Sequence, residues 1–203
     1  MHQLLLATRN SHKTREFAEI LGDEFEVRDL ADAAELPAVA ETGLTFEENA
    51  ILKAVETSKH FQGLVVADDS GLAVDVLNGA PGIYSARYAG EGATDAENMA
   101  KLLAELAGCD PAAGPPAARF QCALALAQEG KILGIFEGAI EGRIVREPRG
   151  SAGFGYDPVF EPSGFARTFG ELSSAEKHRI SHRARAIRAL RTALMAKFCL
   201  SPG

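Results

Sequence analysis

The stretch that decides the fold is Val65-Val66-Ala67-Asp68-Asp69-Ser70-Gly71-Leu72-Ala73-Val74. The apolar run from Leu64 to Ala67 predicts a buried strand that ends at Asp68 and Asp69. Ligands bind at strand ends in open α/β sheets, and paired carboxylates suit Mg²⁺, which shares its oxygen ligands with substrate phosphates. Adjacent strand residues point to opposite faces, so at most one of the two carboxylates aims into a given cleft. A turn is an equal alternative, because Asp-Asp-Ser-Gly is also common turn chemistry.

The composition is that of an ordinary globular protein. The 203 residues are 46% hydrophobic and 24% charged, which allows one large domain or two packed lobes. The net charge of -7 argues against a protein that coats nucleic acid, but it leaves room for a nucleotide site with locally gathered Lys and Arg. Cys109, Cys122 and Cys199 lack metal-ligand spacing, so we expect reduced thiols and a cytoplasmic location. We find no secretory signal and no stretch long enough to cross a membrane.

Hydrophobic periodicity predicts a mixed α/β chain. The predicted strands are residues 4–7, 25–30, 64–67, 120–126 and 132–140, the last two forming an antiparallel pair. The predicted helices start after the polar segment 8–13, at the capping boxes of Thr45, Thr94 and Ser173, and at Ser181.

Three residue groups in the first quarter of the chain suit a phosphate ligand. The segment 8–13 joins a strand to a helix, whose unpaired N–H groups attract phosphate, and Asn10 and Lys13 would add a donor and a charge. In isolation, an N-capped helix explains this segment better. Glu41 in a loop and Lys53 on a helix are likewise ordinary surface residues by themselves. Glu41 gains interest only as a partner for Asp69 in holding Mg²⁺.

Two later segments suit a flat ligand. Glycines flank Phe154, so the backbone could approach a nucleobase closely while the ring stacks on it and Asp157 accepts from a ring N–H. Lys177, His182 and Arg183 form a dense group of donors. A Gly-rich connection with a buried aromatic anchor and a solvated basic face are the simpler explanations of each segment alone.

Six ordered blocks together are specific where each alone is not. They are Ala7-Thr8-x-Asn10-x-x-Lys13, Glu41-Thr42-Gly43-x-Thr45-Phe46-x-Glu48-Asn49-Ala50, Ala67-Asp68-Asp69-Ser70-Gly71-Leu72, Gly79-Ala80-Pro81-Gly82-x-Tyr84-Ser85-Ala86-Arg87, Phe154-Gly155-Tyr156-Asp157-Pro158 and Ser181-His182-Arg183. On these blocks the chain resembles the inosine triphosphate pyrophosphatase family, enzymes that hydrolyse non-standard purine nucleoside triphosphates. Arg9 departs from the pattern, because several relatives carry Gly there.

The resemblance implies a fold, a reaction and an assembly. The fold would be a single α/β domain, residues 1–203, with a long mixed sheet, flanking helices and two lobes around a central cleft. The reaction would be Mg²⁺-dependent hydrolysis of ITP, dITP or XTP to the nucleoside monophosphate and pyrophosphate. The assembly would be a homodimer, and the resemblance implies neither a nucleic acid polymer nor a membrane as a partner.

The resemblance also implies residue roles. Asp69 would be the general base and, with Glu41, a metal ligand, while Lys13 and Lys53 would offset charge on the leaving pyrophosphate. The substrate-binding residues would be Thr8, Arg9, Asn10, Ser11, His12, Lys13, Ser70, Phe154, Gly155, Tyr156, Asp157, Lys177, His182 and Arg183. The donors of the last three would pair with a C6 oxygen of hypoxanthine or xanthine and mismatch the C6 amine of adenine.

Two other functions stay open. One is a Maf-type nucleotide pyrophosphatase that acts on modified pyrimidines, and the other is a non-catalytic nucleotide sensor. The Ser-His-Arg and Phe-Gly-Tyr-Asp blocks favour the purine enzyme. The carboxylate pair argues against a sensor, which needs no group that activates water.

Overall fold

The computed structural model describes residues 2–31, 39–109 and 114–199. In chain order, the helices and strands are β1 (His2–Leu6), α1 (Ser11–Leu21), β2 (Phe25–Asp29), α2 (Phe46–Ser58), β3 (Leu64–Val74), α3 (Asp95–Leu106), β4 (Ala117–Gln128), β5 (Lys131–Ile144), β6 (Phe160–Pro162), α4 (Ser174–Ile180) and α5 (His182–Cys199). The predicted α/β class is confirmed. Within the described ranges, no helix combines the length and the apolar character needed to cross a membrane.

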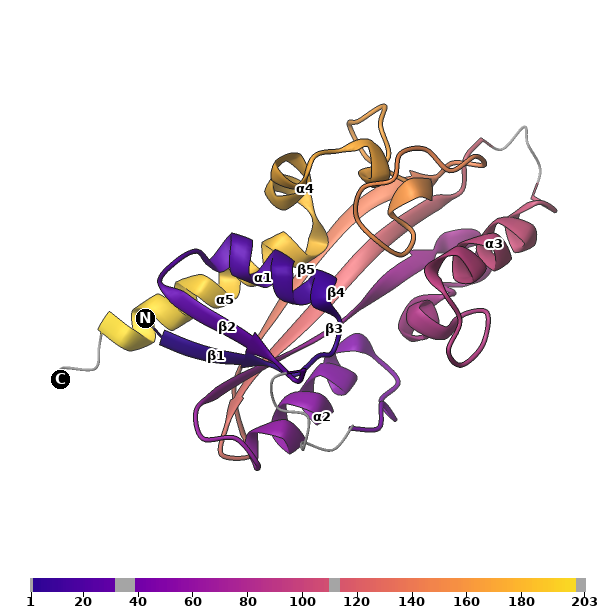
Figure 1. Ribbon diagram of the computed structural model, residues 1–203. Coiled ribbons are helices and arrows are strands. Elements are labelled where there is room, and N and C mark those ends of the chain that lie inside the picture. Colours follow the sequence, from indigo (N-terminus) through magenta and orange to yellow (C-terminus); the bar gives the residue numbers. More distant parts are fainter. Residues whose placement is uncertain (1, 32–38, 110–113, 200–203) are drawn as a thin grey trace. The chain divides into compact units, whose positions relative to one another are not determined.

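The strands form one mixed six-stranded sheet with the order β2-β1-β3-β4-β5-β6 (Figure 1). Strand β1 pairs in parallel with β2 and β3, and β5 pairs antiparallel with β6. Only Glu129 and Gly130 separate the neighbouring strands β4 and β5, and both have positive φ, as a tight hairpin turn requires. The predicted pair of strands around this turn is therefore confirmed, with both strands longer than predicted.

Strand β3 corrects the prediction for the decisive stretch. The strand does not end at Ala67 but continues through both carboxylates to Val74, so the turn alternative is wrong. Burial explains the difference, because Val74 and its neighbours are packed in a second apolar core. The parallel partner β1 nevertheless stops at Leu6, which lies opposite Val66. The two carboxylates therefore lie just past the carboxyl end of the parallel pair.

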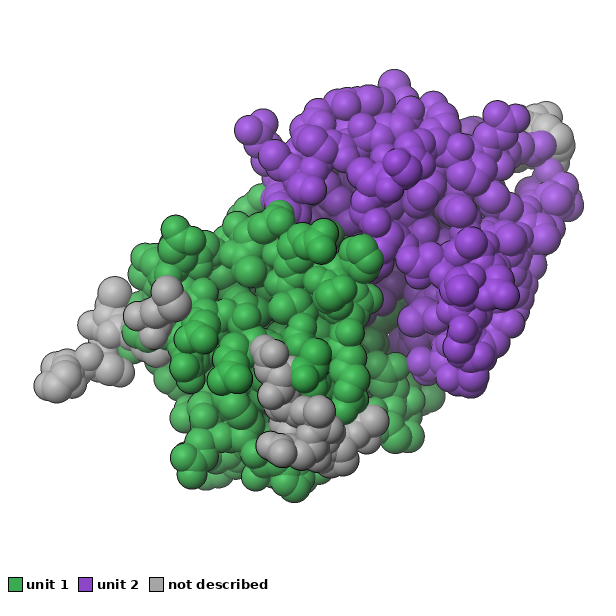
Figure 2. Space-filling view, in the orientation of Figure 1, with its two compact units in different colours: residues 1–69, 122–138, 182–203 green, residues 70–121, 139–181 purple. Residues whose placement is uncertain are grey.

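The chain divides into two compact units (Figure 2). Unit 1 comprises residues 1–69, 122–138 and 182–203, and unit 2 comprises residues 70–121 and 139–181. The boundary falls inside β3, between Asp69 and Ser70. The cleft between two lobes that the resemblance implies stays a prediction.

In unit 1, alternate strand residues pack against different helices. Leu6 and Val66 belong to a core with residues of α1 and α5, whereas Val65 belongs to a core with residues of α2. Because a strand has a period of two, β3 presents Asp68 toward α1 and α5 and Asp69 toward α2. Because they are adjacent residues of one strand, the two carboxylates lie on opposite faces of the sheet, as predicted.

The helix starts confirm the capping signals, with one variation. Thr94 with Glu97 and Ser173 with Glu176 form complete capping boxes. At α2 the side chain of Thr45 accepts from the backbone N–H of Glu48, but the Glu48 carboxylate accepts from the backbone of Leu44 instead, at 2.6 Å. The helix that carries the predicted site residue Lys53 is thus firmly capped.

Unit 2 has its own apolar core, dominated by aromatic residues. The rings of Phe120, Phe160 and Phe169 contact one another with centroid separations from 4.7 to 6.0 Å. Leu102 of α3 and Tyr156 belong to the same core. This core supports the Gly-rich segment in which Phe154 and Asp157 lie.

Candidate active site

Asp68 is the centre of a buried group of ion pairs in unit 1. Its Oδ2 accepts from Nε of Arg183 at 2.8 Å and from the thiol of Cys122 at 3.3 Å, and its Oδ1 is paired with the ammonium of Lys13. Burial by itself would raise the pKa of Asp68, but Arg183 and Lys13 outweigh burial and hold that pKa well below its ordinary value. Asp68 is therefore an anion at any working pH, held by cations from two helices.

Asp69 has a different set of partners, all from the other face of the sheet. Its Oδ1 accepts from Nζ of Lys53 at 2.8 Å, and its Oδ2 accepts from Nδ2 of Asn49 at 3.3 Å. These two donors are four residues apart on α2, so the helical spacing brings them to one carboxylate. Burial raises the pKa of Asp69, Lys53 opposes it, and the result lies above the ordinary value. Asp69 is thus the more basic of the two adjacent carboxylates.

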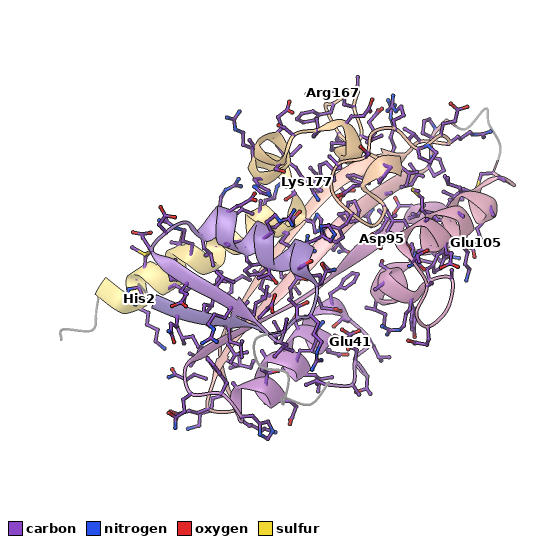
Figure 3. All side chains as sticks on the ribbon, in the orientation of Figure 1. His2, Glu41, Asp95, Glu105, Arg167 and Lys177 are labelled. Atoms are coloured by element: carbon purple, nitrogen blue, oxygen red, sulfur yellow. The ribbon has the colours of Figure 1, made fainter. Side chains whose placement is uncertain are left out.

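The ammonium of Lys53 bridges two carboxylates. It donates to Oε1 of Glu41 at 2.7 Å as well as to Asp69. Burial alone would lower the pKa of Lys53, but the two carboxylates outweigh it and raise that pKa above its ordinary value. Lys53 is therefore charged, and it links Asp69 to Glu41, whose position Figure 3 labels.

Lys13 and Lys53 reach the same point from opposite faces of the sheet. Their Nζ atoms lie 3.4 Å and 3.0 Å from the backbone carbonyl oxygen of Asp68. We call the five residues Lys13, Glu41, Lys53, Asp68 and Asp69 the β3 cluster. It gathers two ammonium groups and three carboxylates just past the end of β1.

The oxygen donors of the β3 cluster fit a hard divalent cation. Glu41 and Asp69 aim at one position, which the ammonium of Lys53 fills. Mg²⁺ is commonly held by one or two carboxylates together with waters and substrate phosphates. Among the described residues, no group of three or more His, Cys, Asp or Glu is arranged to hold a metal ion. Binding of Mg²⁺ by Glu41 and Asp69 stays a prediction.

Arg183 lies in unit 1 as part of a buried chain of charges. Besides its contact with Asp68, its Nη1 donates to Oε2 of Glu16 at 2.6 Å, and its side chain is 3% exposed. Sequence reasoning missed Glu16, although it lies three residues after Lys13 and so shares a face of α1 with it. Through these contacts Arg183 joins α5 to α1 and β3. Recognition of the base by Arg183 stays a prediction.

The segment 8–13 forms the N-terminus of α1, as the simpler interpretation predicts. The side chain of Asn10 caps the helix by accepting from the backbone N–H groups of His12 and Lys13, at 3.0 and 3.3 Å. The hydroxyl of Thr8 accepts from the backbone of Asn10 at 3.1 Å. Arg9, Ser11 and His12 are exposed. Binding of phosphate here stays a prediction.

In unit 2, Asp157 and Lys177 form a buried ion pair. Oδ2 of Asp157 accepts from Nζ of Lys177 at 2.7 Å and from the backbone N–H of Phe154 at 2.9 Å. The two charged side chains are 3% and 6% exposed. The structure therefore brings together three predicted site residues, Phe154, Asp157 and Lys177. The carboxylate of Asp157 already accepts hydrogen bonds from the other two.

Two further contacts hold the turn from Phe154 to Asp157. The backbone N–H of Gly155 donates to Oδ2 of Asp95 at 2.7 Å, and the hydroxyl of Tyr156 donates to the carbonyl of Ser85 at 2.9 Å. Phe154 is half-buried. Of the remaining predicted residues, Ser70 is half-buried in β3, and His182 is buried at the start of α5.

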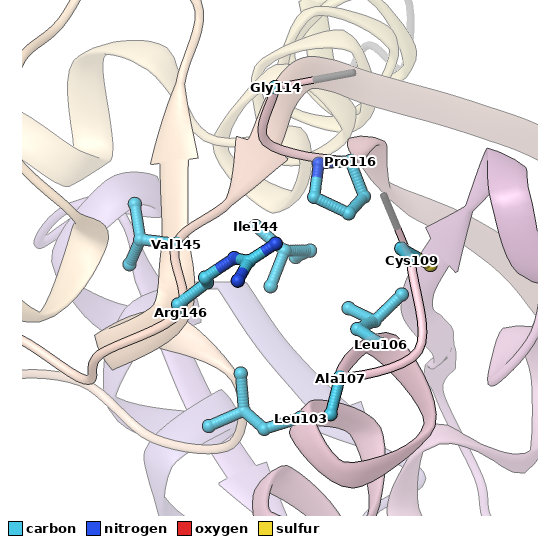
Figure 4. Close-up of a pocket in the computed structure, with 9 residues that line it drawn as sticks. All are labelled: Leu103, Leu106, Ala107, Cys109, Gly114, Pro116, Ile144, Val145 and Arg146. Atoms are coloured by element: carbon cyan, nitrogen blue, oxygen red, sulfur yellow. The ribbon is translucent and has the colours of Figure 1, made fainter. Parts of the chain in front are cut away.

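A separate apolar pocket lies in unit 2 (Figure 4). Its volume is about 200 Å³, and its lining residues are Leu103, Leu106, Ala107, Cys109, Gly114, Pro116, Ile144, Val145 and Arg146. None of the predicted site residues lines it. The pocket is therefore distinct from the groups of charged residues described above.

Comparison with known proteins identifies close relatives. The sequence model of the Ham1 family matches residues 4–193. The dITP/XTP pyrophosphatase of Bacillus licheniformis is 49% identical over 191 residues, which are 94% of this chain and 96% of that protein. The dITP/XTP pyrophosphatase of Bacillus subtilis is 47% identical over 197 residues, which are 97% and 98% of the two chains.

Solved structures agree with the sequence comparison. A HAM1 protein from Coxiella burnetii has a TM-score of 0.85 and 44% identity, over 97% of this chain and 100% of that one. A nucleoside-triphosphatase / dITP/XTP pyrophosphatase from Mycobacterium abscessus has a TM-score of 0.73 and 46% identity, over 93% and 98% of the two chains. The resemblance inferred from the six sequence blocks is confirmed, and the chain belongs to the Ham1 family.

Proposed function

We propose that the chain is a Mg²⁺-dependent pyrophosphatase that hydrolyses ITP, dITP and XTP to the nucleoside monophosphate and pyrophosphate. The observation that carries the proposal is Asp69, a buried carboxylate of raised pKa beside Lys53 and Glu41. Relatives that are 47–50% identical over nearly the whole chain bear the name dITP/XTP pyrophosphatase, which supports the same substrate class. The name of the relatives does not itself specify Mg²⁺ or ITP, and the donor chemistry of the β3 cluster supports the metal.

The β3 cluster has the groups that hydrolysis of a phosphate anhydride needs. Transfer of phosphoryl-type groups depends mainly on positioning and on neutralising charge. Lys13 and Lys53 would offset the charge of the leaving pyrophosphate, and the segment 8–13 would bind the triphosphate. Glu41 and Asp69 would hold Mg²⁺, which supplies charge neutralisation and a lower pKa of water when bound. Asp69, the more basic carboxylate, would accept the proton of the attacking water.

The base would be recognised by the ring and the donors of the later blocks. Phe154 would stack on the purine, with Gly155, Tyr156, Asp157 and Ser70 as further substrate-binding residues. Lys177, His182 and Arg183 would donate to a C6 oxygen, whereas the C6 amine of adenine would leave them unpaired. Each unpaired buried donor costs about 1–3 kcal/mol, so the loss of two would suppress ATP hydrolysis by several hundredfold.

A product analysis tests the proposal. The purified chain is incubated with ITP, XTP, dUTP and ATP, with and without Mg²⁺, and the products are followed by phosphorus NMR without added inorganic pyrophosphatase. We expect pyrophosphate and monophosphate from ITP and XTP only, and none after chelation of Mg²⁺. Hydrolysis of dUTP alone would favour the Maf-type alternative, and binding without turnover would favour a sensor. The homodimer and the cytoplasmic location are further predictions, which sizing of the native protein and fractionation of cells would test.

A further inference from the structure

The ammonium of Lys177 has an unusual set of neighbours within unit 2. It pairs with Asp157, and its Nζ also lies over two aromatic rings, 5.0 Å from the centroid of Phe154 and 5.7 Å from that of Phe169. A cation within about 6 Å of a ring centroid is attracted to the negative face of the ring. Phe169, which the sequence blocks do not include, therefore shares this ammonium with two residues proposed to bind the base.

Phe169 is rigidly held, which suits it to fix the position of a neighbour. Its side chain is fully buried, and its ring lies 5.2 Å from that of Phe160 and 6.0 Å from that of Phe120, centroid to centroid. A capping box between Thr168 and Glu171 caps the start of the short 3-10 helix Phe169–Glu171. A side chain locked by packing on several sides can hold a polar group at a constant position.

The two rings over Lys177 differ in burial. Phe154 is half-buried in a Gly-rich segment, so part of its surface is open to a ligand. Phe169 has no exposed surface and contacts the ammonium from within the core. The contact of Phe169 with Lys177 therefore lies away from the surface that Phe154 exposes.

We propose that Phe169 is a specificity-determining positioning residue, whose ring holds the ammonium of Lys177 where it can donate to a purine C6 oxygen. The inference rests on the proposed function, in which Lys177 makes that contact. A displaced or mobile ammonium would weaken binding of an oxygen, which needs a directed donor. It would not weaken binding of a C6 amine, for which the ammonium has no acceptor.

Fluorinated phenylalanines separate this role from packing. Mono-, di- and trifluorophenylalanine at position 169 reduce the negative charge of the ring face step by step, while the size of the ring changes little. We expect the ratio of kcat/KM for ITP over ATP to fall progressively, by about three- to tenfold for the trifluoro ring, because an ion–ring contact of this kind is modest in strength. The matched control is the same series at Phe160, a fully buried neighbour of the same core, where the ratio should stay constant. A ratio that does not respond at position 169, or that responds equally at position 160, would overturn the inference.

A measurement without substrate keeps this test independent of the proposed function. Two aromatic rings shift the ε-CH₂ protons of Lys177 upfield in the NMR spectrum, and the Lys177→Met variant assigns the signal. Phe169→Leu should move that signal toward its ordinary position, whereas Phe160→Leu should leave it in place. An unchanged signal in Phe169→Leu would contradict the contact even in an active enzyme. A wild-type chain that hydrolyses neither ITP nor XTP would instead contradict the proposed function and leave the contact standing.

Discussion

The carboxylate of Asp68 and the guanidinium of Arg183 form a buried ion pair, 2.8 Å from Oδ2 to Nε, with side-chain exposures of 0% and 3%. The pair joins the centre of β3 to the first turn of α5, two segments that are 115 residues apart in the chain. Asp69, the next residue, has its side chain on the other face of the sheet, where its carboxylate accepts from Asn49 and Lys53 of α2. We therefore expect removal of the charge to have opposite effects on the stability of the chain at these two neighbouring carboxylates.

We expect Asp68→Asn to destabilise the chain by about 3–5 kcal/mol at neutral pH, because it removes the carboxylate paired with Lys13 and leaves Arg183 with Glu16 alone. The folded-state pKa of Asp68 is depressed. Its stabilising contribution is therefore complete above the ordinary carboxyl pKa and is lost as the pH falls toward the depressed value. Urea unfolding at several pH values measures this. The exposed pair of Asp75 and Arg119 gives the control, since Asp75→Asn should cost less than about 1 kcal/mol.

Asp69→Asn is expected to lower kcat by about 100-fold or more without lowering stability. The folded-state pKa of Asp69 is raised, so its ionised form opposes folding at neutral pH, and a neutral amide of the same shape removes that opposition. Lys53 keeps Glu41 as a partner. Steady-state kinetics on ITP and urea unfolding of the same preparation check both parts. A variant that retained a tenth of the wild-type rate would show that Asp69 is not the base.

Local patterns in the sequence account for part of the geometry of the β3 cluster. The period of two in β3 separates Asp68 from Asp69, the spacing of four on α2 brings Asn49 and Lys53 to Asp69, and both follow from backbone geometry. Capping residues likewise marked the helix starts, because their effect is confined to one turn.

Long-range partners could not be predicted in the same way. No local rule states that Arg183 meets Glu16, since 167 residues separate them in the chain. The extension of β3 past Asp69 was missed because turn propensity acts locally, whereas the burial of Val74 depends on the core of unit 2. Phe169 was missed for a related reason, because a buried Phe in sequence is indistinguishable from any other core residue.

Glu41→Gln should raise the Mg²⁺ concentration needed for half-maximal rate. The amide is a poorer ligand than the carboxylate. Loss of a residue that only supports a metal ligand lowers metal affinity by roughly 10-fold or more, so loss of a direct ligand should lower it by at least as much. Titration of Mg²⁺ at saturating ITP measures the change. Glu56→Gln is the matched control, because the side chain of Glu56 lies in the last turn of α2, is largely exposed and pairs with Lys59. An equal Mg²⁺ requirement in the two variants would exclude Glu41 as a ligand.

Lys13→Ala should lower kcat/KM for ITP and for GTP by a similar factor, because in the proposed function Lys13 offsets charge at the phosphates and does not contact the base. Its ammonium lies beside the carbonyl of Asp68, together with that of Lys53. Lys59→Ala, which removes an exposed lysine, should leave both constants unchanged. Circular dichroism confirms that the variant is folded before kinetics are compared. A loss confined to one of the two substrates would place Lys13 at the base end instead.

The turn that carries Phe154 offers a matched pair of glycines. Gly153 and Gly155 both have positive φ, of 77° and 61°, so a side chain at either position costs about 1–2 kcal/mol in backbone strain. A Cβ atom at Gly155 would meet nothing within 4 Å, whereas a Cβ atom at Gly153 would lie 1.9 Å from Oδ2 of Asp157. Gly153→Ala must therefore displace the carboxylate that holds Lys177.

We expect Gly155→Ala to lower the free energy of unfolding only by the backbone strain. Gly153→Ala should lower it by about 3–5 kcal/mol, the cost of breaking a buried ion pair. Urea unfolding of the two variants measures the difference, and the ratio of kcat/KM for ITP over ATP shows whether the pair serves base recognition. The ratio should fall further in Gly153→Ala than in Gly155→Ala, because only the first moves Asp157 and with it the ammonium of Lys177. Equal stabilities in the two variants would mean that Asp157 can move aside without cost. The ion pair of Asp157 and Lys177 would then not stabilise this turn.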